Sequence, residues 1–524
     1  MKIERYSAVL ILFLCFSFVF AQTGNRQQTK KLHFSLQDCI ASALENNLDL
    51  AVQIYNPELA DIEVAQAKEF FMPQFSLGYN LRRTKQPSTW WLEGAKPVET
   101  DSDIYNFGIS HQLPTGGNYT LTLTGYSEDT TRAFQSVNPY YSSTLRFEFT
   151  QPLLKDFGFN ISRRQILIAQ NNYQKSLKQL RATLIDLVYQ VEEAYWNYVY
   201  NIENLKVKQK ALEWARQLLE KTRREVEVGT KAPIEILSAE AEVASREADI
   251  LQAEANVKSA EDLLKKLMNL PNLGWDYKII PTDKPTFEKK DISLEEALKI
   301  AFEKRPELEQ WKIDIENKDL DFKYAKNQLL PSLNLVASFW SPGLSGDRLI
   351  YLNNNPFTGI IVDRIKGGKN EAVNEAFKLK YKNWSVRLDL NIPISNLISR
   401  ANFVKAKIAL EQAQLQLKNL EQSIYLEVRN ALREVETNRK KVEAYRKSRE
   451  LAEKKLEAEE KKLSVGLSTN FQVLQYQRDL ANQLSLELRA IIDYNLSLAK
   501  LQKVLGTILE EKNIKFYSVL KSEK

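Results

Sequence analysis

The chain contains two tandem copies of one plan, and this duplication limits its fold more than any other feature. Ser35-Leu36 reappears as Ser293-Leu294, and Pro73 reappears as Pro331 at the same spacing. Two tip-like Val-Gly pairs, at 228–229 and 465–466, also correspond. A repeat of this length predicts two similar structural units in one chain. We assign the first repeat to 35–270 and the second to 292–508, with a linker at 271–291, an extension at 22–34 and a tail at 509–524.

Each copy contains one helix that is too long for a globular domain. Helical patterns are expected at 35–71 and 293–329, each ending before a proline. Very long helices are then expected at 162–228 and 396–465, followed by returning helices at 233–270 and 470–505. The first long helix would extend about 100 Å at 1.5 Å per residue. Its apolar positions are three and four residues apart, which predicts coiled-coil packing: Leu184, Leu187, Val191, Ala194 and Tyr198.

Strands with period-2 alternation lie between the first helix and the long helix of each copy. Phe147 alternates with Arg146 and Glu148, and Leu388 alternates with Arg387 and Asp389. An ordinary half-buried sheet would show this pattern. An outer-membrane barrel would show it too, with apolar residues on lipid and the four charged residues in the lumen.

Four strands per chain cannot close a membrane barrel, because the smallest such barrels have about eight strands. Open sheet edges are not tolerated in lipid, so the strands must be shared between chains. Three copies would supply twelve strands, although strand arithmetic also allows two or four copies. An extra hairpin at 104–126 could add to the barrel, extend the strand ends or form an external flap. We expect a flap or extended ends, since twelve strands already close.

Composition bears on targeting and excludes several functions. Residues 1–21 have a basic start, an apolar run and Ala21 at the end, which predicts a secretory signal peptide. Cys39 is the only cysteine after it, and its counterpart is Ala297, so we expect a buried small side chain. No catalytic motif, cofactor motif or metal-ligand spacing is present. The net charge is +6, and the basic residues are spread along the chain without forming a cluster, which argues against nucleic-acid binding.

The order of these motifs resembles that of TolC-like outer membrane efflux proteins. The resemblance rests on the serine starts at 35 and 293, the prolines that end helices and strands, and the two Val-Gly tips. It implies a homotrimer in outer-membrane lipid, a shared twelve-stranded β-barrel and an α-helical barrel across the periplasm. The predicted class is thus α+β and mostly helical. The implied partners are a periplasmic adaptor and an inner-membrane pump for efflux or type I secretion. A non-conducting periplasmic scaffold or adaptor is the alternative, and an enzyme is disfavoured.

The resemblance also implies roles for residues at the ends of the long helices. Adaptor docking is expected at the two tips, which comprise Val228, Gly229, Thr230, Val465, Gly466 and Leu467. The positions of the family's acidic gate ring fall on Gln472 and Gln475, which are amides. The first copy has an acid, Glu235, at the position equivalent to Gln472. The two glutamines can instead be ordinary solvated residues of a helix.

Overall fold

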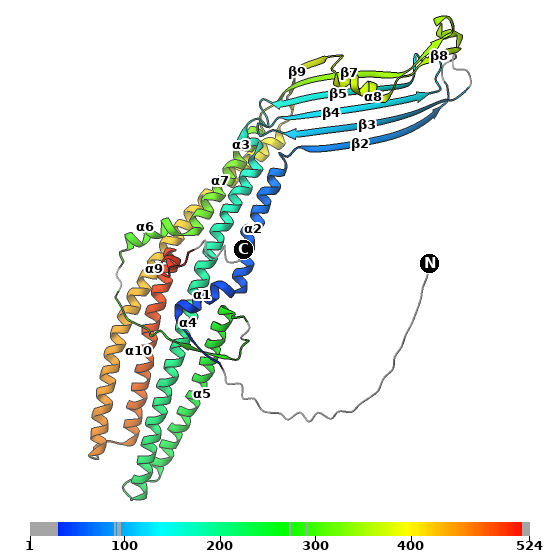
Figure 1. The fold of residues 1–524 in the computed structure, drawn as a ribbon. Helices are drawn as coiled ribbons and strands as arrows, with labels where there is room; N and C mark the ends of the chain where they lie inside the picture. The colour runs from blue at the N-terminus through cyan, green and yellow to red at the C-terminus, as the bar shows by residue number, and fades with distance from the viewer. Residues whose placement is uncertain (1–29, 89–90, 92–95, 272–273, 290–291, 516–524) are drawn as a thin grey trace, which may run out of the picture.

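The protein is a long helical rod with a β-sheet at one end and two helical tips at the other (Figure 1). The computed structural model describes residues 30–88, 91, 96–271, 274–289 and 292–515. The predicted signal peptide at 1–21, most of the extension at 22–34 and the end of the tail from 516 lie outside the described residues. In the part of the chain that is described, none of the helices combines the length and apolar character of a membrane span.

The first helix of each copy is two helices. The expected single helix at 35–71 breaks at Asn47, and the one at 293–329 breaks at Arg305. Asn47 has an extended backbone and its side chain accepts a hydrogen bond from the Leu50 amide, so it caps a new helix. Pro306 disfavours helical geometry at Arg305 and occupies the first turn of the next helix. The observed helices are α1 Leu36–Asn46, α2 Leu48–Glu69, α6 Leu294–Lys304 and α7 Pro306–Asn327.

The long helices and their return helices are confirmed to within two residues at each end. The longest, α9, has 68 residues, and α4 has 64. Short helices precede α4 and follow α10. The elements are α3 Phe159–Ser162, α4 Arg164–Glu227, α5 Ile234–Met268, α9 Leu397–Ser464, α10 Asn470–Leu505 and α11 Ile508–Glu511.

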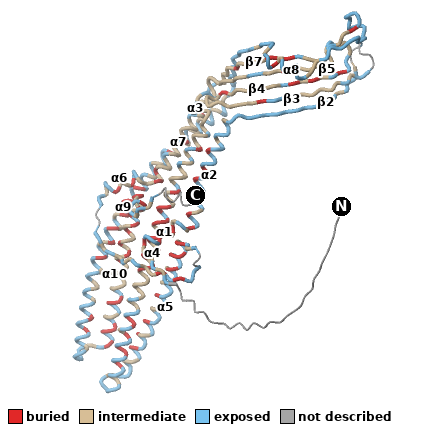
Figure 2. The backbone as a smooth tube through the Cα atoms, viewed as in Figure 1, coloured by how far each residue is buried: buried red, intermediate tan, exposed pale blue. Residues whose placement is uncertain are grey.

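The main core lies halfway along the rod, where the buried residues gather in Figure 2. The predicted seam of α4 is buried there, including Leu184, Val191 and Tyr198. Strand β1 Lys30–Phe34 pairs in parallel with β6 Tyr277–Pro281 beside this core. The Tyr198 hydroxyl donates a 2.7 Å hydrogen bond to the carbonyl of Ile279 in β6. The end of the extension, Lys30–Phe34, therefore pairs with part of the linker beside the core.

The sheet contains more strands than the four that the sequence predicts. Its order is β2-β3-β4-β5-β7-β8, with β9 also paired to β7, and all neighbours are antiparallel. The 104–126 hairpin lies inside this sheet as β3 and β4, so neither of the expected forms, a flap or extended strand ends, is observed. The strands are β2 Gln74–Gln86, β3 Val98–Gln112, β4 Asn118–Thr130, β5 Val137–Pro152, β7 Ser332–Tyr351, β8 Ile361–Ile365 and β9 Asn383–Asn391.

The segment between β7 and β9 also has structure. It contains the 3-10 turns η2 Leu352–Asn354 and η3 Pro356–Thr358, then β8 and the helix α8 Lys369–Phe377. Helix α8 packs on β7, with Ala372 and Ala376 buried against the sheet. The predicted class, α+β and mostly helical with a tandem repeat, is confirmed.

Candidate functional site at the helix tips and the sheet

Each tip is a tight turn built on a glycine with left-handed backbone geometry. Gly229 has φ of +78° and Gly466 has φ of +77°. The Thr230 hydroxyl donates a 2.7 Å hydrogen bond to the carbonyl of Glu225, and the Leu467 amide donates one of 2.8 Å to the carbonyl of Lys462. These bonds satisfy carbonyls that a helix end would otherwise leave unpaired. The predicted tip residues therefore form two equivalent turns.

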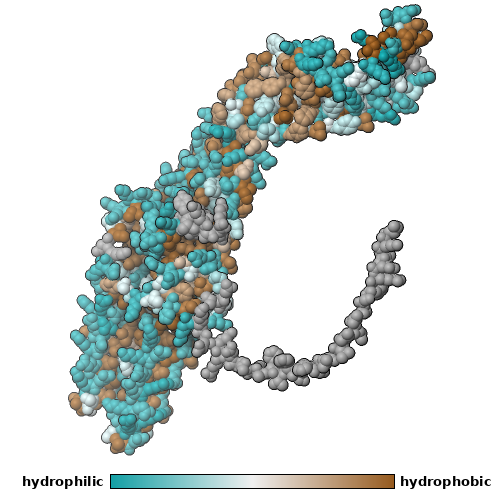
Figure 3. Space-filling model, viewed as in Figure 1, coloured by the Kyte–Doolittle hydropathy of each residue, from teal (hydrophilic) through white to brown (hydrophobic). Residues whose placement is uncertain are grey.

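Both tips expose apolar side chains. Val228 is 73% exposed, Val465 is 68% exposed and Leu467 is 79% exposed. Ile234 and Phe471, in the first turns of the return helices, are also exposed. Figure 3 shows hydrophobic residues at the end of a rod whose surface there is mostly hydrophilic. Apolar groups gathered at one end of a polar surface are typical of a site that binds another protein.

The candidate gate residues lie next to the second tip. Gln472 and Gln475 are both exposed on the first turns of α10. The Gln472 main-chain N–H donates to the Thr469 hydroxyl at 3.3 Å, and the Gln472 side-chain oxygen lies 3.2 Å from the Ser468 hydroxyl oxygen. Glu235 lies in α5, which belongs to the other helix pair, and is half-buried. The structure thus places the two amides on one surface and Glu235 on a different helix pair.

Polar contacts that the sequence reasoning did not identify join the two helix pairs near the tips. The Asn470 side-chain amide of α10 donates a 2.9 Å hydrogen bond to the Thr222 hydroxyl of α4, and both residues are buried. Arg478 of α10 forms an ion pair with Glu242 of α5, which also contacts Arg246 at 2.7 Å. Asn470 lies just before the buried Val473 and Leu474. A polar residue next to this apolar seam is the sequence feature that could have indicated a buried hydrogen bond here.

The carboxylate of Glu459 stabilises the turn of the second tip. The Ser468 hydroxyl donates a 2.6 Å hydrogen bond to Glu459, and the Lys462 ammonium lies 3.1 Å from the same carboxylate. The hydrogen bond from Ser468, followed by the contact with Lys462, lowers the pKa of Glu459. This carboxylate therefore stays charged at neutral pH and holds the turn between α9 and α10.

The two faces of the sheet differ in chemistry across six strands. Paired residues in neighbouring strands share a face. One apolar row crosses the whole sheet through Phe75, Ile109, Leu121, Phe147, Phe339 and Trp384. The adjacent row, on the opposite face, contains Gln74, Ser110, Thr120, Glu148, Ser338 and Ser385.

The four charged residues predicted for the lumen all lie on the polar face. Arg146 and Glu148 are 3.7 Å apart, and Arg387 and Asp389 are 2.8 Å apart. The Ser338 hydroxyl donates a 3.0 Å hydrogen bond to Glu148. The structure thus brings the predicted charges together as two ion pairs on the face opposite the apolar row.

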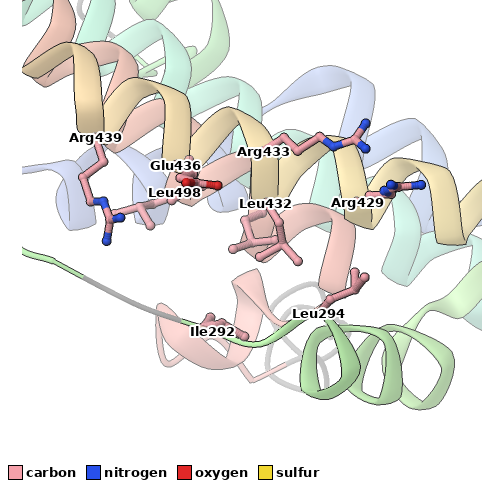
Figure 4. Close-up of a pocket in the computed structure, with 10 residues that line it drawn as sticks. Ile292, Leu294, Arg429, Leu432, Arg433, Glu436, Arg439 and Leu498 are labelled. Atoms are coloured by element: carbon pink, nitrogen blue, oxygen red, sulfur yellow. The ribbon is translucent and has the colours of Figure 1, made fainter.

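A cavity of about 360 Å³ lies on the side of the rod, between α9 and the segment that leads into α6. Figure 4 shows Leu432 of α9 pointing toward Ile292 and Leu294, with Arg429 and Arg433 farther along the same helix. Among the residues that the structure describes, no three His, Cys, Asp or Glu side chains gather into a group able to hold a metal.

Comparisons with known proteins identify the family. The model of the outer membrane efflux protein family matches residues 39–270 and 297–507, which is most of the chain and follows its two repeats. No curated protein sequence matches.

Solved structures share the fold. The Campylobacter jejuni CmeC outer membrane channel is 16% identical, with a TM-score of 0.64 over 92% of this chain and 90% of that one. The Neisseria gonorrhoeae MtrE outer membrane channel is 21% identical, with a TM-score of 0.60 over 90% and 89%. A membrane protein from Pseudomonas aeruginosa is 18% identical, with a TM-score of 0.64 over 90% of both chains. The family match over both repeats, together with this fold, shows that the chain belongs to the outer membrane efflux protein family.

Proposed function

We propose that three copies of the chain form a passive exit duct that spans the outer membrane and the periplasm. The duct serves an efflux or type I secretion system. Its tips dock to a periplasmic adaptor and, through it, to an inner-membrane pump. The family match supports a channel role in the outer membrane.

The observation that carries the proposal is that the two outer strands of the sheet, β2 and β9, each have one side without a paired strand among the described residues. Within the described residues, β2 pairs only with β3 and β9 pairs only with β7. Each outer strand therefore has a free row of backbone N–H and C=O groups. Such edges are not tolerated in lipid, where no water can satisfy them. A second copy of the chain, pairing its β9 with β2, would satisfy both.

Below each open strand runs an exposed apolar seam on a helix. Helix α2 leads into β2, and its exposed seam contains Leu48, Val52, Tyr55, Leu59 and Ile62. Helix α9 follows β9, and its seam near the sheet contains Leu397, Val404, Ile408 and Leu415. The spacing of the α2 seam is that of a coiled coil. The opposite face of α2 is already buried against its own chain, so the second stripe indicates a second partner.

Every copy offers the same two edges, so the contact between copies is head-to-tail. Because open edges are not tolerated in lipid, this head-to-tail pairing must close into a ring. Edge pairing alone allows rings of different size, and the family resemblance favours three copies. The alternative, a non-conducting periplasmic scaffold, is disfavoured by the sheet, because it would leave the apolar row across six strands in water.

The proposal assigns roles to the remaining candidate residues. The Val-Gly tips bind the adaptor, with Val228, Val465 and Leu467 as apolar contacts. The two ion pairs on the polar face of the sheet line the lumen. Gln472 and Gln475 line the narrow periplasmic end.

The test is the mass and conductance of the full-length protein purified in detergent. We expect a complex of three chains that gives stable single-channel conductance in a planar bilayer. Cysteine pairs on the polar faces of β2 and β9, such as Asn80→Cys with Ser385→Cys, are tested over several pairing registers. We expect the pair that matches the true register to cross-link neighbouring chains. A monodisperse monomer that needs no detergent would contradict the duct.

A further inference from the structure

We infer that the β3–β4 hairpin adds two membrane-spanning strands to each chain, so that three copies close an eighteen-stranded barrel. The inference rests on the proposed trimeric duct and concerns the number of strands in its wall. Six strands per chain, β2, β3, β4, β5, β7 and β9, would then enter the barrel, while β8 pairs only with the far end of β7, at Arg348–Tyr351.

The pairing of the hairpin is the first support. Strand β3 pairs with β2 along the whole of β2, from Gln74 to Gln86. Strand β4 pairs with β3 from Asn118 to Thr130 and with β5 on its other side. The hairpin thus separates β2 from β5. If it were a flap outside the barrel, β2 and β5 would have to pair with each other to keep the wall continuous.

The side chains of the hairpin have the alternation of a membrane strand. Tyr105, Phe107 and Ile109 of β3 lie on the apolar face, as do Leu121 and Leu123 of β4. The residues between them are Asn106, Gly108 and Ser110 in β3, and Thr120, Thr122 and Thr124 in β4. A hairpin surrounded by water does not need one apolar face that continues those of its neighbours.

The apolar band ends within two same-face pairs of one level on the first three strands, at Leu81 of β2, Tyr105 of β3 and Leu123 of β4. Tyr79 of β2 is paired with Tyr105 of β3, which gives an aromatic row at the edge of the band. Two pairs farther along the same face, Arg83 forms an ion pair with Asp101, which is paired with Asp129 of β4. Aromatic rows and then charges mark the boundary between lipid and water. The hairpin therefore crosses the same apolar layer as β2.

The near end of the hairpin is fixed where the sheet meets the helices. His111 lies 2.9 Å from the carbonyl of Phe71 and 3.0 Å from the Tyr119 hydroxyl. The carbonyl can only accept, so Nε2 carries a proton. The Gly158 amide donates to the carbonyl of Thr115 at 3.1 Å. Gly116 has φ of +95°, and a Cβ there would lie 2.1 Å from the carbonyl oxygen of Asp156.

The inserted turn leads into no helix of its own, although the Ser162 hydroxyl of α3 lies 3.5 Å from the carbonyl of Leu113. A cavity of about 710 Å³ lies beneath the turn, bordered by Gln66 of α2, Phe70 just after that helix, Arg164 of α4 and Tyr324 of α7. The sheet is thus wider than the helical wall that supports it. Barrel diameter grows with strand number, and barrels of 16–18 strands enclose an aqueous channel. The barrel would be a wider mouth on a narrower helical duct.

The test measures which residues of the hairpin face lipid. Single cysteines are placed in a Cys39→Ala background, labelled with bimane and reconstituted in vesicles that contain a lipid with a nitroxide on its acyl chain. Phe107→Cys and Leu121→Cys report on the hairpin, and Phe147→Cys on β5 is the reference. Asn106→Cys and Thr122→Cys are matched controls on the polar face.

We expect lipid quenching at Phe107 and Leu121 equal to that at Phe147, and quenching by aqueous iodide at Asn106 and Thr122. Lipid quenching at Phe147 with only iodide quenching at Phe107 and Leu121 would place the hairpin outside the barrel and overturn the inference, while the duct would stand. No lipid quenching at any position would contradict the duct itself. Electron cryomicroscopy of the unmodified trimer provides a second test, because twelve strands in the wall would overturn the inference.

Discussion

At the scale of single residues, burial predicts that the one cysteine outside the predicted signal peptide, Cys39, does not react with reagents in solution. Cys39 and its counterpart Ala297 are both fully buried in helices that start at equivalent serines. Burial, assisted by the charges of Asp38 and Asp283, raises the pKa of the Cys39 thiol to about 12. We expect no reaction with an alkylating reagent at pH 8 in the native protein and complete reaction in denaturant, as measured by mass spectrometry. Rapid native alkylation would show that the thiol is accessible.

The glycines of the tips allow docking to be separated from folding. Gly466 has a left-handed backbone and no neighbouring atom within 4 Å of an added Cβ, so a side chain there causes backbone strain of about 1–2 kcal/mol but no clash. We expect Gly466→Phe to abolish export while the yield of trimer stays near normal. Gly359, with φ of +65° and the same open surroundings, lies in the loop before β8 and is the matched control. Gly359→Phe should retain export. Unimpaired export by Gly466→Phe would exclude this tip as the docking site.

At the scale of helices and strands, the elements with strong periodicity could be predicted and the others could not. The heptad seam predicts α4, and the ends of α4, α5, α9 and α10 agree with the structure because Val-Gly turns and prolines bound them. The break at Asn47 was missed, since asparagine is also compatible with a helix interior. The pairing of β1 with β6 was missed because each strand has five residues and lies far from the other in sequence.

The 104–126 hairpin shows a different limit. Its alternation predicts two strands, and both are present. Periodicity does not specify which sheet a strand joins, and the assumption that twelve strands suffice favours a flap or extended strand ends over two added strands. The sequence does not predict helix α8, because its contact with the sheet depends on the missing side chain of Gly343. A Cβ on Gly343 would lie 2.0 Å from the Ala372 carbonyl oxygen.

The exposed seam of α2 gives a test of assembly at the same scale. Leu59→Glu places a carboxylate where the next copy is expected to pack, and an unpaired charge in an interface costs about 3–5 kcal/mol. We expect this variant to yield folded monomer, with the helical circular dichroism signal retained and the trimer lost in native mass spectrometry. Ala65→Glu adds the same charge to an exposed position of α2 outside the seam and should remain trimeric. A stable Leu59→Glu trimer would show that α2 does not form the contact between chains.

At the scale of the whole molecule, two polar contacts near the tips join the helix pairs of the two repeats. The ion pair between Arg478 and Glu242 and the hydrogen bond between Asn470 and Thr222 cross from α10 to the first copy's helices. These contacts join residues from different repeats, so the duplication predicts each pair of helices but not the contact between them. The candidate gate lies beside this contact. Ion passage at the candidate gate should therefore be tested in the assembled duct, where both helix pairs are in place.

The final prediction concerns ion block at the narrow end of that duct. Gln472 and Gln475 are exposed on one surface of α10, and threefold repetition would produce two rings of amides. Amides form hydrogen bonds but carry no net charge, whereas rings of carboxylates concentrate cations. We expect polyvalent cations on the periplasmic side to block single-channel conductance only weakly. The double variant Gln472→Asp with Gln475→Asp should be blocked strongly, and Glu235→Gln should leave the weak block unchanged, because Glu235 belongs to the other helix pair. Strong block of the unmodified channel that the double variant does not alter would show that these glutamines do not line the constriction.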